Sequence, residues 1–592
     1  MNNKVKVFLK KFFIWRLKHI NDKNFLLILS VLIGIVVGFA ALLLKFSVEL
    51  VKRFVNYCVG MQDIGYIYIF FPAIGILLTI IFINYILKRK LGHGIPMVLF
   101  AISRNNAKIP FHNIFSRIVS SSLTVGFGGS VGLEGPVVAT GAAIGSNIGS
   151  FFRLNYRQII LLIGCAATAA IAGIFKAPIT AIIFALEVIM LDLTTASLLP
   201  LLLSSISAAL ISFLFTGQNF AFNVTNIQQF NIADVVFYVL LGFLSGLFAA
   251  GFSKIHLKIA GFFENVKSKW IKFIIGSISL GLLIFLFPSL YGEGYDVINF
   301  ATNGKLNFVF ENTFYSNFID GPWLVILFLS LILFFKIFAI SATFIGGGVG
   351  GLFAPSLFLG SVLGLLFSLI IRQLDIDLPL ANFALAGMAG VMSGVMHAPL
   401  TAIFLIAEIT GGYSLFVPLM IVSAIAYFTA RIFSQYSIET LLLAKQGVLL
   451  THNADANMLT MLKLETLIEK NFLTINEEAT LRDLTQIIIK STRNIYVVVD
   501  EENNLKGIVW FEHIKHLIFM QERFDNTYVK DLMYMPDTII EIGMSLKEIA
   551  EMFEETDNYN IPVINEGKYI GFISRAKLFS QYRNLLKMFS DD

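Results

Sequence analysis

A glycine-rich turn contains one glutamate, and its carboxylate is the group in the sequence best placed to do chemistry. Residues 128–136 read GGSVGLEGP, and the carboxylate belongs to Glu134. Because proline is favoured in the first turn of a helix, the pattern predicts a helix that begins at this turn. A helix start presents unpaired N–H groups and the positive end of the helix dipole, so it can bind an anion without a fixed positive charge. A carboxylate at this place can compete with an anion, and its protonation would release it.

Two further segments have the same design. Residues 346–355 read GGGVGGLFAP, and residues 92–96 read GHGIP. Each predicts a glycine turn that leads into a helix with an early proline. Three such helix starts that converge could hold a small dehydrated anion loosely enough to let it leave again.

The elements that must position these turns are membrane helices. A helix that crosses a bilayer needs roughly 20 mostly apolar residues. Apolar runs of this length or longer occupy residues 25–44, 64–87, 118–152, 193–233, 337–371 and 378–430. The longer runs are broken by glycine and proline, so each predicts several helices, some of which stop partway through the bilayer.

Composition separates this membrane part from a soluble tail. The chain has 592 residues, of which 56% are hydrophobic; residues 1–450 hold 29 Lys and Arg against 16 Asp and Glu, whereas residues 451–592 hold 15 against 23. The basic residues gather at the N-terminus and between apolar stretches, which indicates membrane orientation rather than nucleic-acid binding. Only two cysteines are present, which excludes a disulfide framework and a cysteine metal cluster. The HExxH motif of zinc peptidases is absent from the sequence, and we expect no enzyme.

The membrane part contains an internal repeat. Residues 132–136 match 351–355 at an offset of 219, and residues 173–182 match 394–403 at an offset of 221, with Glu187 matching Glu408. Two homologous halves predict a transporter or channel whose site lies where the halves meet. For Glu187 and Glu408 a shared structural role such as helix capping is favoured over ion contact. Lys176 and Lys336 are expected either to raise the local anion concentration or to reach the membrane interface.

These motifs resemble those of the CLC chloride channels and anion/proton exchangers. The resemblance covers most of residues 25–450 and includes 437–441, which read SIETL and resemble the last membrane helix of the family. It implies an all-α polytopic fold with an inverted repeat of about eighteen helices. It also implies a homodimer in a lipid bilayer with one pathway per subunit for chloride or another small anion, and no metal or other cofactor.

The resemblance carries roles onto particular residues. Glu134 falls on the gating glutamate, the amides of Leu352 and Phe353 fall on the central anion site, and residues 132–136 would line the outer site. The expected anion pathway comprises His93, Gly94, Ile95, Gly132, Leu133, Gly135, Gly351, Leu352, Phe353, Ala354 and Glu439.

Three departures from the family pattern leave the transport mode open. Val188 stands where the exchangers of the family carry an internal glutamate for protons. His93 stands in place of the serine of the first turn. Glu439 stands in place of the tyrosine of the last helix, or else Tyr436 is that tyrosine in a shifted alignment. The main prediction is a chloride channel that conducts passively through a glutamate gate. The alternative is a chloride/proton antiporter, or a weakly coupled transporter, whose proton route uses Glu439 and His93.

The soluble tail resembles a tandem pair of α/β CBS domains. Helices are predicted over 481–490 and 546–555, and strands over 495–499, 505–510, 561–564 and 569–574. Nucleotide-binding members carry an aspartate after the final strand of each unit, where this chain has His513 and Lys577. We therefore expect weak or absent nucleotide binding and a role in dimerisation or in coupling to gating.

The expected organisation runs from a basic N-terminus, 1–23, to a membrane domain, 24–450, with halves 24–233 and 234–450. A linker, 451–470, and two CBS domains, 471–526 and 527–586, follow. Both termini are expected in the cytoplasm of a multi-pass plasma membrane protein, with a bacterial inner membrane favoured by composition.

Overall fold

The computed structural model describes residues 11, 14–16, 18–60, 69–89, 91–92, 94–189, 195–217, 224, 227–303, 321–445, 464–556 and 558–590. The predictions for His93 and for linker residues 451–463 lie outside this set. The chain divides into two compact units, Met1–Gln446 and Gly447–Asp592, which are described separately below.

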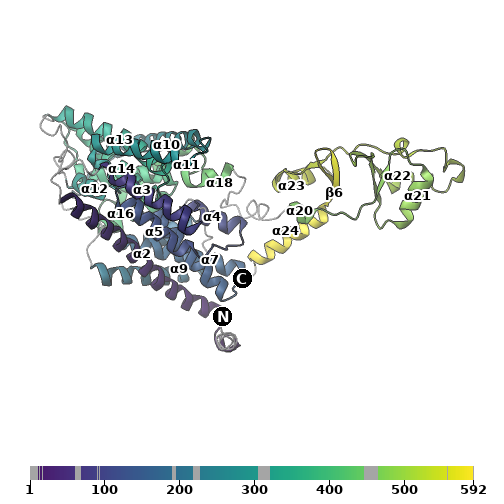
Figure 1. The fold of residues 1–592 in the computed structure, drawn as a ribbon, viewed down its shortest axis with the longest axis horizontal. Helices are drawn as coiled ribbons and strands as arrows, with labels where there is room; N and C mark the ends of the chain where they lie inside the picture. Colours follow the sequence, from purple (N-terminus) through teal and green to yellow (C-terminus); the bar gives the residue numbers. More distant parts are fainter. Residues whose placement is uncertain are drawn as a thin grey trace. The chain divides into compact units, whose positions relative to one another are not determined.

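The first unit is built from helices that pack side by side (Figure 1). Among the described residues, eight helical stretches are long and apolar enough to cross a membrane. They correspond to α2 (Asp22–Gly60), α7 (Tyr156–Phe175), α9 (Thr195–Thr216), α10 (Val235–Glu264), α11 (Lys269–Leu286), α13 (Pro322–Ile345), α14 (Phe353–Arg372) and α17 (Phe416–Phe433).

Further helices fill the space between them. They are α3 (Phe71–Ile81) with its π-helical continuation η2 (Phe82–Leu87), α4 (Gly94–Arg104), α5 (Asn113–Gly126), α6 (Glu134–Phe151), α8 (Pro178–Glu187), α12 (Tyr295–Thr302), α15 (Leu380–Met396), α16 (Pro399–Ile409), α18 (Ile438–Lys445) and the short 3-10 turns η3 (Ile232–Asp234) and η4 (Pro288–Leu290). The prediction that long apolar runs split into several helices is confirmed. The run 118–152 breaks between α5 and α6, and the run 378–430 forms α15, α16 and α17.

Glycines let two equivalent helix pairs pack closely. A Cβ atom at Gly145 of α6 would collide with the carbonyl of Leu162 on α7, and one at Gly364 of α14 would collide with the carbonyl of Phe383 on α15. Gly145 and Gly364 are repeat-equivalent, so each half of the unit holds its motif helix against the following helix in the same way.

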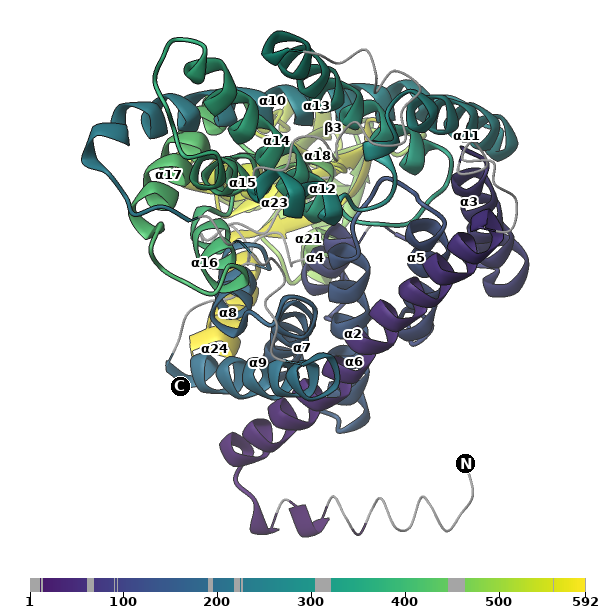
Figure 2. The ribbon, with the colours of Figure 1, turned by 90° about the vertical axis from the view of Figure 1, so that its left-hand side faces the viewer.

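Two glutamates cap helices of the opposite half. The carboxylate of Glu187, at the end of α8, accepts bonds from the backbone N–H (2.7 Å) and the hydroxyl (2.7 Å) of Thr401 in α16. Glu408, near the end of α16, accepts the equivalent bonds from Thr180 in α8, at 2.7 and 2.6 Å. Figure 2 shows α8 and α16 next to each other. The capping role favoured for both residues is confirmed, and the exchange of identical contacts relates the two halves by a local two-fold axis.

Loss of either cap is expected to destabilise the membrane unit. The change Glu408→Ala leaves the first-turn N–H groups of α8 without an acceptor, and we expect a loss of about 1–3 kcal/mol in the free energy of unfolding. Thermal unfolding in detergent, followed by tryptophan fluorescence, measures it. Glu264→Ala removes an exposed carboxylate at the end of α10 and serves as the control. Equal stability of both variants would contradict the cap.

The second unit contains two sheets of the same topology. In the first sheet β1 (Thr474–Asn476) runs parallel to β2 (Ile495–Val499), which pairs antiparallel with β3 (Leu505–Trp510). In the second, β4 (Ile540–Glu541) runs parallel to β5 (Asn560–Asn565), which pairs antiparallel with β6 (Lys568–Ser574). The accompanying helices are α20 (Leu464–Leu467), α21 (Leu481–Lys490), α22 (Phe511–Ile514), α23 (Leu546–Glu555) and α24 (Arg575–Ser590), with 3-10 turns η7 (Gln521–Arg523) and η8 (Val529–Asp531). The predicted αβ duplication is confirmed.

Equivalent contacts build both halves of this unit. The helices α21 and α23 each begin with a capping box, made by Thr480 with Asp483 and by Ser545 with Glu548. The sheets share an apolar cluster in which the rings of Phe472 and Phe572 stack 4.3 Å apart. Local capping and this shared core explain why the pair forms one compact unit.

The turn between β2 and β3 contains a carboxylate that matters for acid stability. Asp500 accepts bonds from the side chain (2.9 Å) and the backbone N–H (2.8 Å) of Asn504, and these bonds lower the pKa of Asp500 to about 2. Because the folded value lies below the unfolded one, the stabilisation is present above pH ~4 and is lost as the pH falls towards 2. We therefore expect Asp500→Asn to speed amide hydrogen exchange in β2 and β3 at pH 7. The difference from the wild type should shrink in acid. Asp537→Asn, at an exposed position, is the control, and unchanged exchange at pH 7 would refute the role of Asp500.

Candidate anion site

The three predicted helix starts meet at one place. Gly132 and Gly351 pair through two backbone hydrogen bonds, of 2.9 Å from the Gly132 N–H and 2.8 Å from the Gly351 N–H. A Cβ atom at Gly94 would lie 2.9 Å from the backbone of Gly135, and one at Gly351 would lie 2.8 Å from the Gly135 nitrogen. The starts of α4, α6 and α14 therefore touch through glycines, and only residues without a side chain allow this approach.

Glu134 lies inside this junction. The residue is 1% exposed; its Oε1 accepts a 2.7 Å bond from the Tyr295 hydroxyl, and its Oε2 accepts a 3.4 Å bond from the Ala354 N–H at the start of α14. A Cβ atom at Gly132 would collide with the carboxylate. The side chain thus places negative charge at the N-terminus of a helix from the other half, where an anion would be stabilised in the same way.

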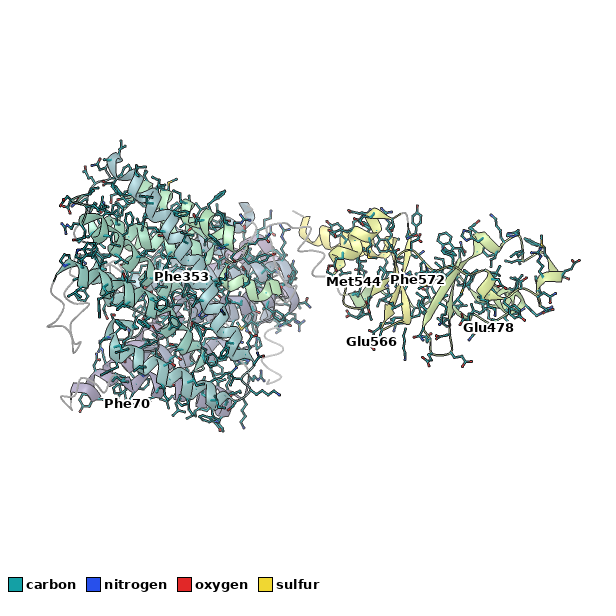
Figure 3. All side chains as sticks on the ribbon, turned by 90° about the horizontal axis from the view of Figure 1, so that it is seen from above. Phe70, Phe353, Glu478, Met544, Glu566 and Phe572 are labelled. Atoms are coloured by element: carbon teal, nitrogen blue, oxygen red, sulfur yellow. The ribbon has the colours of Figure 1, made fainter. Side chains whose placement is uncertain are left out.

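The predicted central residues sit on the same helix start. Leu352 precedes α14 and Phe353 is its first residue, and they are 7% and 1% exposed. The first N–H groups of a helix have no intrahelical acceptor, so they are available to a ligand. The Phe353 ring lies in the interior of the helical unit (Figure 3), with its centre 5.4 Å from that of Phe175 and 6.4 Å from that of Phe184. Leu133 and Ile95 are buried beside the other two starts.

Tyr295 is a site residue that the sequence reasoning missed. It begins α12, and the preceding loop is fixed beneath the Glu134 turn by bonds from the Ser130 hydroxyl to the Leu290 carbonyl (2.8 Å) and from the Gly292 N–H to the Gly128 carbonyl (3.0 Å). The available signal was the segment 291–295, YGEGY, which places two tyrosines and a carboxylate between apolar stretches.

A buried lysine supports the same loop. Lys336 of α13 is fully buried, so the expectation that it reaches the membrane interface is wrong. Its ammonium donates to the carbonyls of Leu290 (3.4 Å) and Gly292 (3.2 Å) and lies 4.6 Å from the centre of the Phe358 ring. The loop carbonyls and the ring give this charge the contacts that it needs away from water. Lys176, in contrast, is bonded at the protein surface to the Gly217 carbonyl (2.8 Å).

The structure places two of the three departures from the family pattern; the third, His93, lies outside the described residues. Val188 follows α8 and is 6% exposed, so an apolar side chain occupies that position. Glu439 lies in the first turn of α18, which packs against α4 and α15, and it is half-buried. No described residue forms a hydrogen bond or ion pair with its carboxylate. The pairing of Glu439 with His93 stays a prediction, as does the choice between Glu439 and Tyr436, whose carbonyl accepts a 2.7 Å bond from Ser434.

In the second unit, the positions of the missing aspartates carry other contacts. His513 lies between Trp510 and Tyr534, with ring centres 6.2 and 5.6 Å away. The backbone N–H of Lys577 donates to the Ser574 hydroxyl (3.2 Å), which itself donates to Glu469 (2.5 Å). Neither position presents a carboxylate to a ribose.

The fold and the site together describe a helical protein with several candidate membrane spans, in which three helix starts meet between two related halves. The profile of the family described as "Voltage gated chloride channel" matches residues 74–431, and that of the CBS domain matches 464–509 and 529–584. The chain belongs to the voltage-gated chloride channel (CLC) family, and it carries a tandem CBS pair. Its fold is the mostly helical CLC fold with an α/β C-terminal region.

The printed names of two relatives mention a channel in one case and an exchanger in the other. A putative chloride channel protein ClcB-like of Ralstonia nicotianae is 30% identical over 61% of this chain and 81% of its own length. The H(+)/Cl(-) exchange transporter ClcA of Vibrio cholerae is 27% identical over 70% of this chain and 88% of its own length.

Solved structures share the fold. A slow cyanobacterial Cl-/H+ antiporter superposes with a TM-score of 0.61 at 23% identity, over 71% of this chain and 97% of its own. A eukaryotic CLC transporter superposes with a TM-score of 0.58 at 18% identity, over 93% of this chain and 97% of its own.

Proposed function

We propose that the protein exchanges chloride for protons, with Glu134 as the group that both ions share. The observation that carries the proposal is the bond from the Ala354 N–H to the Glu134 carboxylate. Chloride and the ionised carboxylate compete for the same helix start, so chloride entry favours the protonated, released side chain. Anion movement and proton uptake are thereby linked through one occupied position. The exchange activity in the printed name of the Vibrio cholerae relative agrees with this reading.

A passive chloride channel is the second candidate, and Val188 favours it. This position carries a buried apolar side chain, which cannot accept a proton. An exchanger without a proton acceptor at position 188 needs another proton route. For that route we propose Glu439 of α18 together with His93. The change Glu439→Gln is expected to reduce proton transport while chloride transport continues. If Glu439→Gln and the wild type transport protons at the same rate, Glu439 is not part of the proton route.

Flux in liposomes separates the two candidates. Purified protein is reconstituted with an outward chloride gradient and equal pH on both sides, and the internal pH is followed with a dye. Proton movement against its own gradient, driven by chloride, is expected for the exchanger. A channel would release chloride, and protons would move only in response to the membrane potential. Proton movement that stops when a potassium ionophore clamps the membrane potential would therefore establish the channel instead.

We propose a homodimer in the plasma membrane with both chain ends in the cytoplasm. The seven basic residues within 1–23 support this orientation. Mass photometry of the detergent-solubilised protein tests the dimer, and protease access to the C-terminal unit in sealed vesicles of known orientation tests the topology.

For the CBS pair we propose dimerisation or coupling to the gate without nucleotide binding through the usual carboxylate contacts. The residue types at 513 and 577 support this, because neither histidine nor lysine offers the two acceptor oxygens with which an aspartate binds both ribose hydroxyls. Titration calorimetry of the full-length protein with ATP and with AMP is expected to give no saturable heat. A saturable signal for either nucleotide would overturn this proposal.

A further inference from the structure

A second carboxylate, that of Glu293, is buried beside the Glu134 turn. Glu293 lies in the loop between η4 and α12 and is 6% exposed. On one side of it, the Gly292 N–H donates to the Gly128 carbonyl (3.0 Å); on the other side, the Tyr295 hydroxyl donates to Glu134 (2.7 Å). The loop therefore holds Glu293 between two bonds to the segment that carries the gate. An ionisable side chain buried in a membrane protein is by default a candidate for function.

A partly exposed lysine of α2 pairs with this carboxylate. The Nζ of Lys52 lies 3.6 Å from the Oε2 of Glu293, and the side chain of Lys52 is 36% exposed, whereas that of Glu293 is 7% exposed. Lys336, which donates to the Gly292 carbonyl, brings a second cation whose charge reaches Glu293. Buried carboxylates stay ionised where cations offset their charge, so the two lysines let Glu293 keep its negative charge.

Glu293 and Glu134 repel each other. The titratable groups whose charges reach Glu293 come from four helices and their adjoining loops, and they are Lys45 and Lys52 of α2, Glu134 of α6, Tyr295 and Asp296 of α12, and Lys336 of α13. Within this set, Glu134 is the group that the proposed function protonates and releases. Like charges oppose each other's ionisation, and the effect is stronger in a buried site than at a water-exposed surface. The charge of Glu293 therefore acts against the ionised form of Glu134, which occupies the start of α14.

We propose that Glu293 acts through Glu134, as a positioning residue whose negative charge sets the pH at which the gate opens. The neighbouring charge favours proton uptake by Glu134, and the protonated side chain leaves the Ala354 N–H. The inference rests on the proposed function and deepens it, because it names a group that regulates the position shared by both ions. The pair with Lys52 keeps the regulating charge in place.

Replacement of Glu293 by glutamine tests the proposal, because it keeps the size of the side chain and removes the charge. Chloride flux into liposomes is measured between pH 4 and pH 8, with the same pH on both sides. We expect the pH of half-maximal flux to fall by roughly one unit, since Glu134 loses a repelling neighbour. Glu49→Gln is the matched control. That carboxylate is 54% exposed on α2 and pairs with Arg53, so the variant should keep the wild-type midpoint.

The direction of the shift separates an effect of the charge from an effect of packing. If the substitution only loosened the loop, the Tyr295 hydroxyl would hold Glu134 less firmly, and chloride flux at neutral pH would rise instead of fall. Glu293→Asp keeps the charge and is expected to return the midpoint to nearly the wild-type value. Should Glu293→Gln fail to fold, Glu293→Ala removes the same charge and is expected to give the same downward shift.

Two results would overturn the inference. One is an unchanged or raised midpoint in the variants that lack the charge, and the other is a midpoint in Glu293→Asp that equals theirs. The proposed function is tested separately by Glu134→Gln. If flux in that variant no longer depends on pH while Glu293→Gln matches the wild type, the inference fails and the proposed function stands. A pH dependence that persists in Glu134→Gln would contradict the proposed function itself.

Discussion

Replacement of Glu134 by glutamine is expected to abolish proton transport while chloride flux continues. Glutamine keeps the shape of the side chain and can still lie near the Ala354 N–H, but its amide does not take up or release a proton between pH 4 and pH 8. A positioned acid or base contributes about a hundredfold or more to proton transfer, so we expect proton flux to fall by at least that factor. The rate of chloride flux should become independent of pH.

Liposome assays of chloride and proton flux between pH 4 and pH 8 measure both effects. Glu264→Gln is the matched control, because that carboxylate is exposed at the end of α10, and it should behave as the wild type does. If the Glu134→Gln protein keeps wild-type proton transport, or wild-type pH dependence of chloride flux, then Glu134 is not the gate. The proposed exchange mechanism would then be wrong.

Replacement of Tyr295 by phenylalanine is expected to open the pathway. The change removes one hydroxyl, which donates a 2.7 Å bond to Glu134, and keeps the ring. A hydrogen bond to a charged group contributes about 1.5–3 kcal/mol, so the released state of the carboxylate should become roughly 10 to 150 times more frequent. Chloride flux at neutral pH should rise, and the number of protons moved per chloride should fall.

Tyr291→Phe provides the control for this prediction. Tyr291 comes from the same loop and its ring lies against Gly128, but it does not bond to the Glu134 carboxylate. The control should keep wild-type flux. Equal flux in Tyr295→Phe and the wild type would show that the Ala354 N–H alone holds the carboxylate.

The candidate site was predictable where it depends on local chemistry and on the repeat. Glycines followed by proline predicted the helix starts at Glu134 and Phe353, and the repeat predicted that the two would meet. The partners of Glu134 across the fold were harder to foresee. Tyr295 lies 161 residues from Glu134, at the start of α12, and nothing local indicates that the loop before α12 folds under the Glu134 turn.

The burial of the cations was equally hidden. Arg117 is buried on α5, a helix rich in serine, and Lys336 on α13, a helix rich in phenylalanine, but a sequence does not say which side of a membrane helix faces lipid, protein or a cavity. The interface position considered for Lys336 failed for this reason. The C-terminal helices and strands were predicted closely, because α21 and α23 are strongly amphipathic and begin with capping residues that mark their first turns.

The paired backbone of Gly132 and Gly351 restricts how the gate can work. Two reciprocal bonds hold the starts of α6 and α14 at a set separation, so neither helix can retreat without breaking both. In the proposed mechanism, the moving part is then the Glu134 side chain alone, and the backbone of both helix starts stays in place. Opening in the proposed mechanism would therefore depend on the protonation of one side chain and would need no rearrangement of the whole subunit.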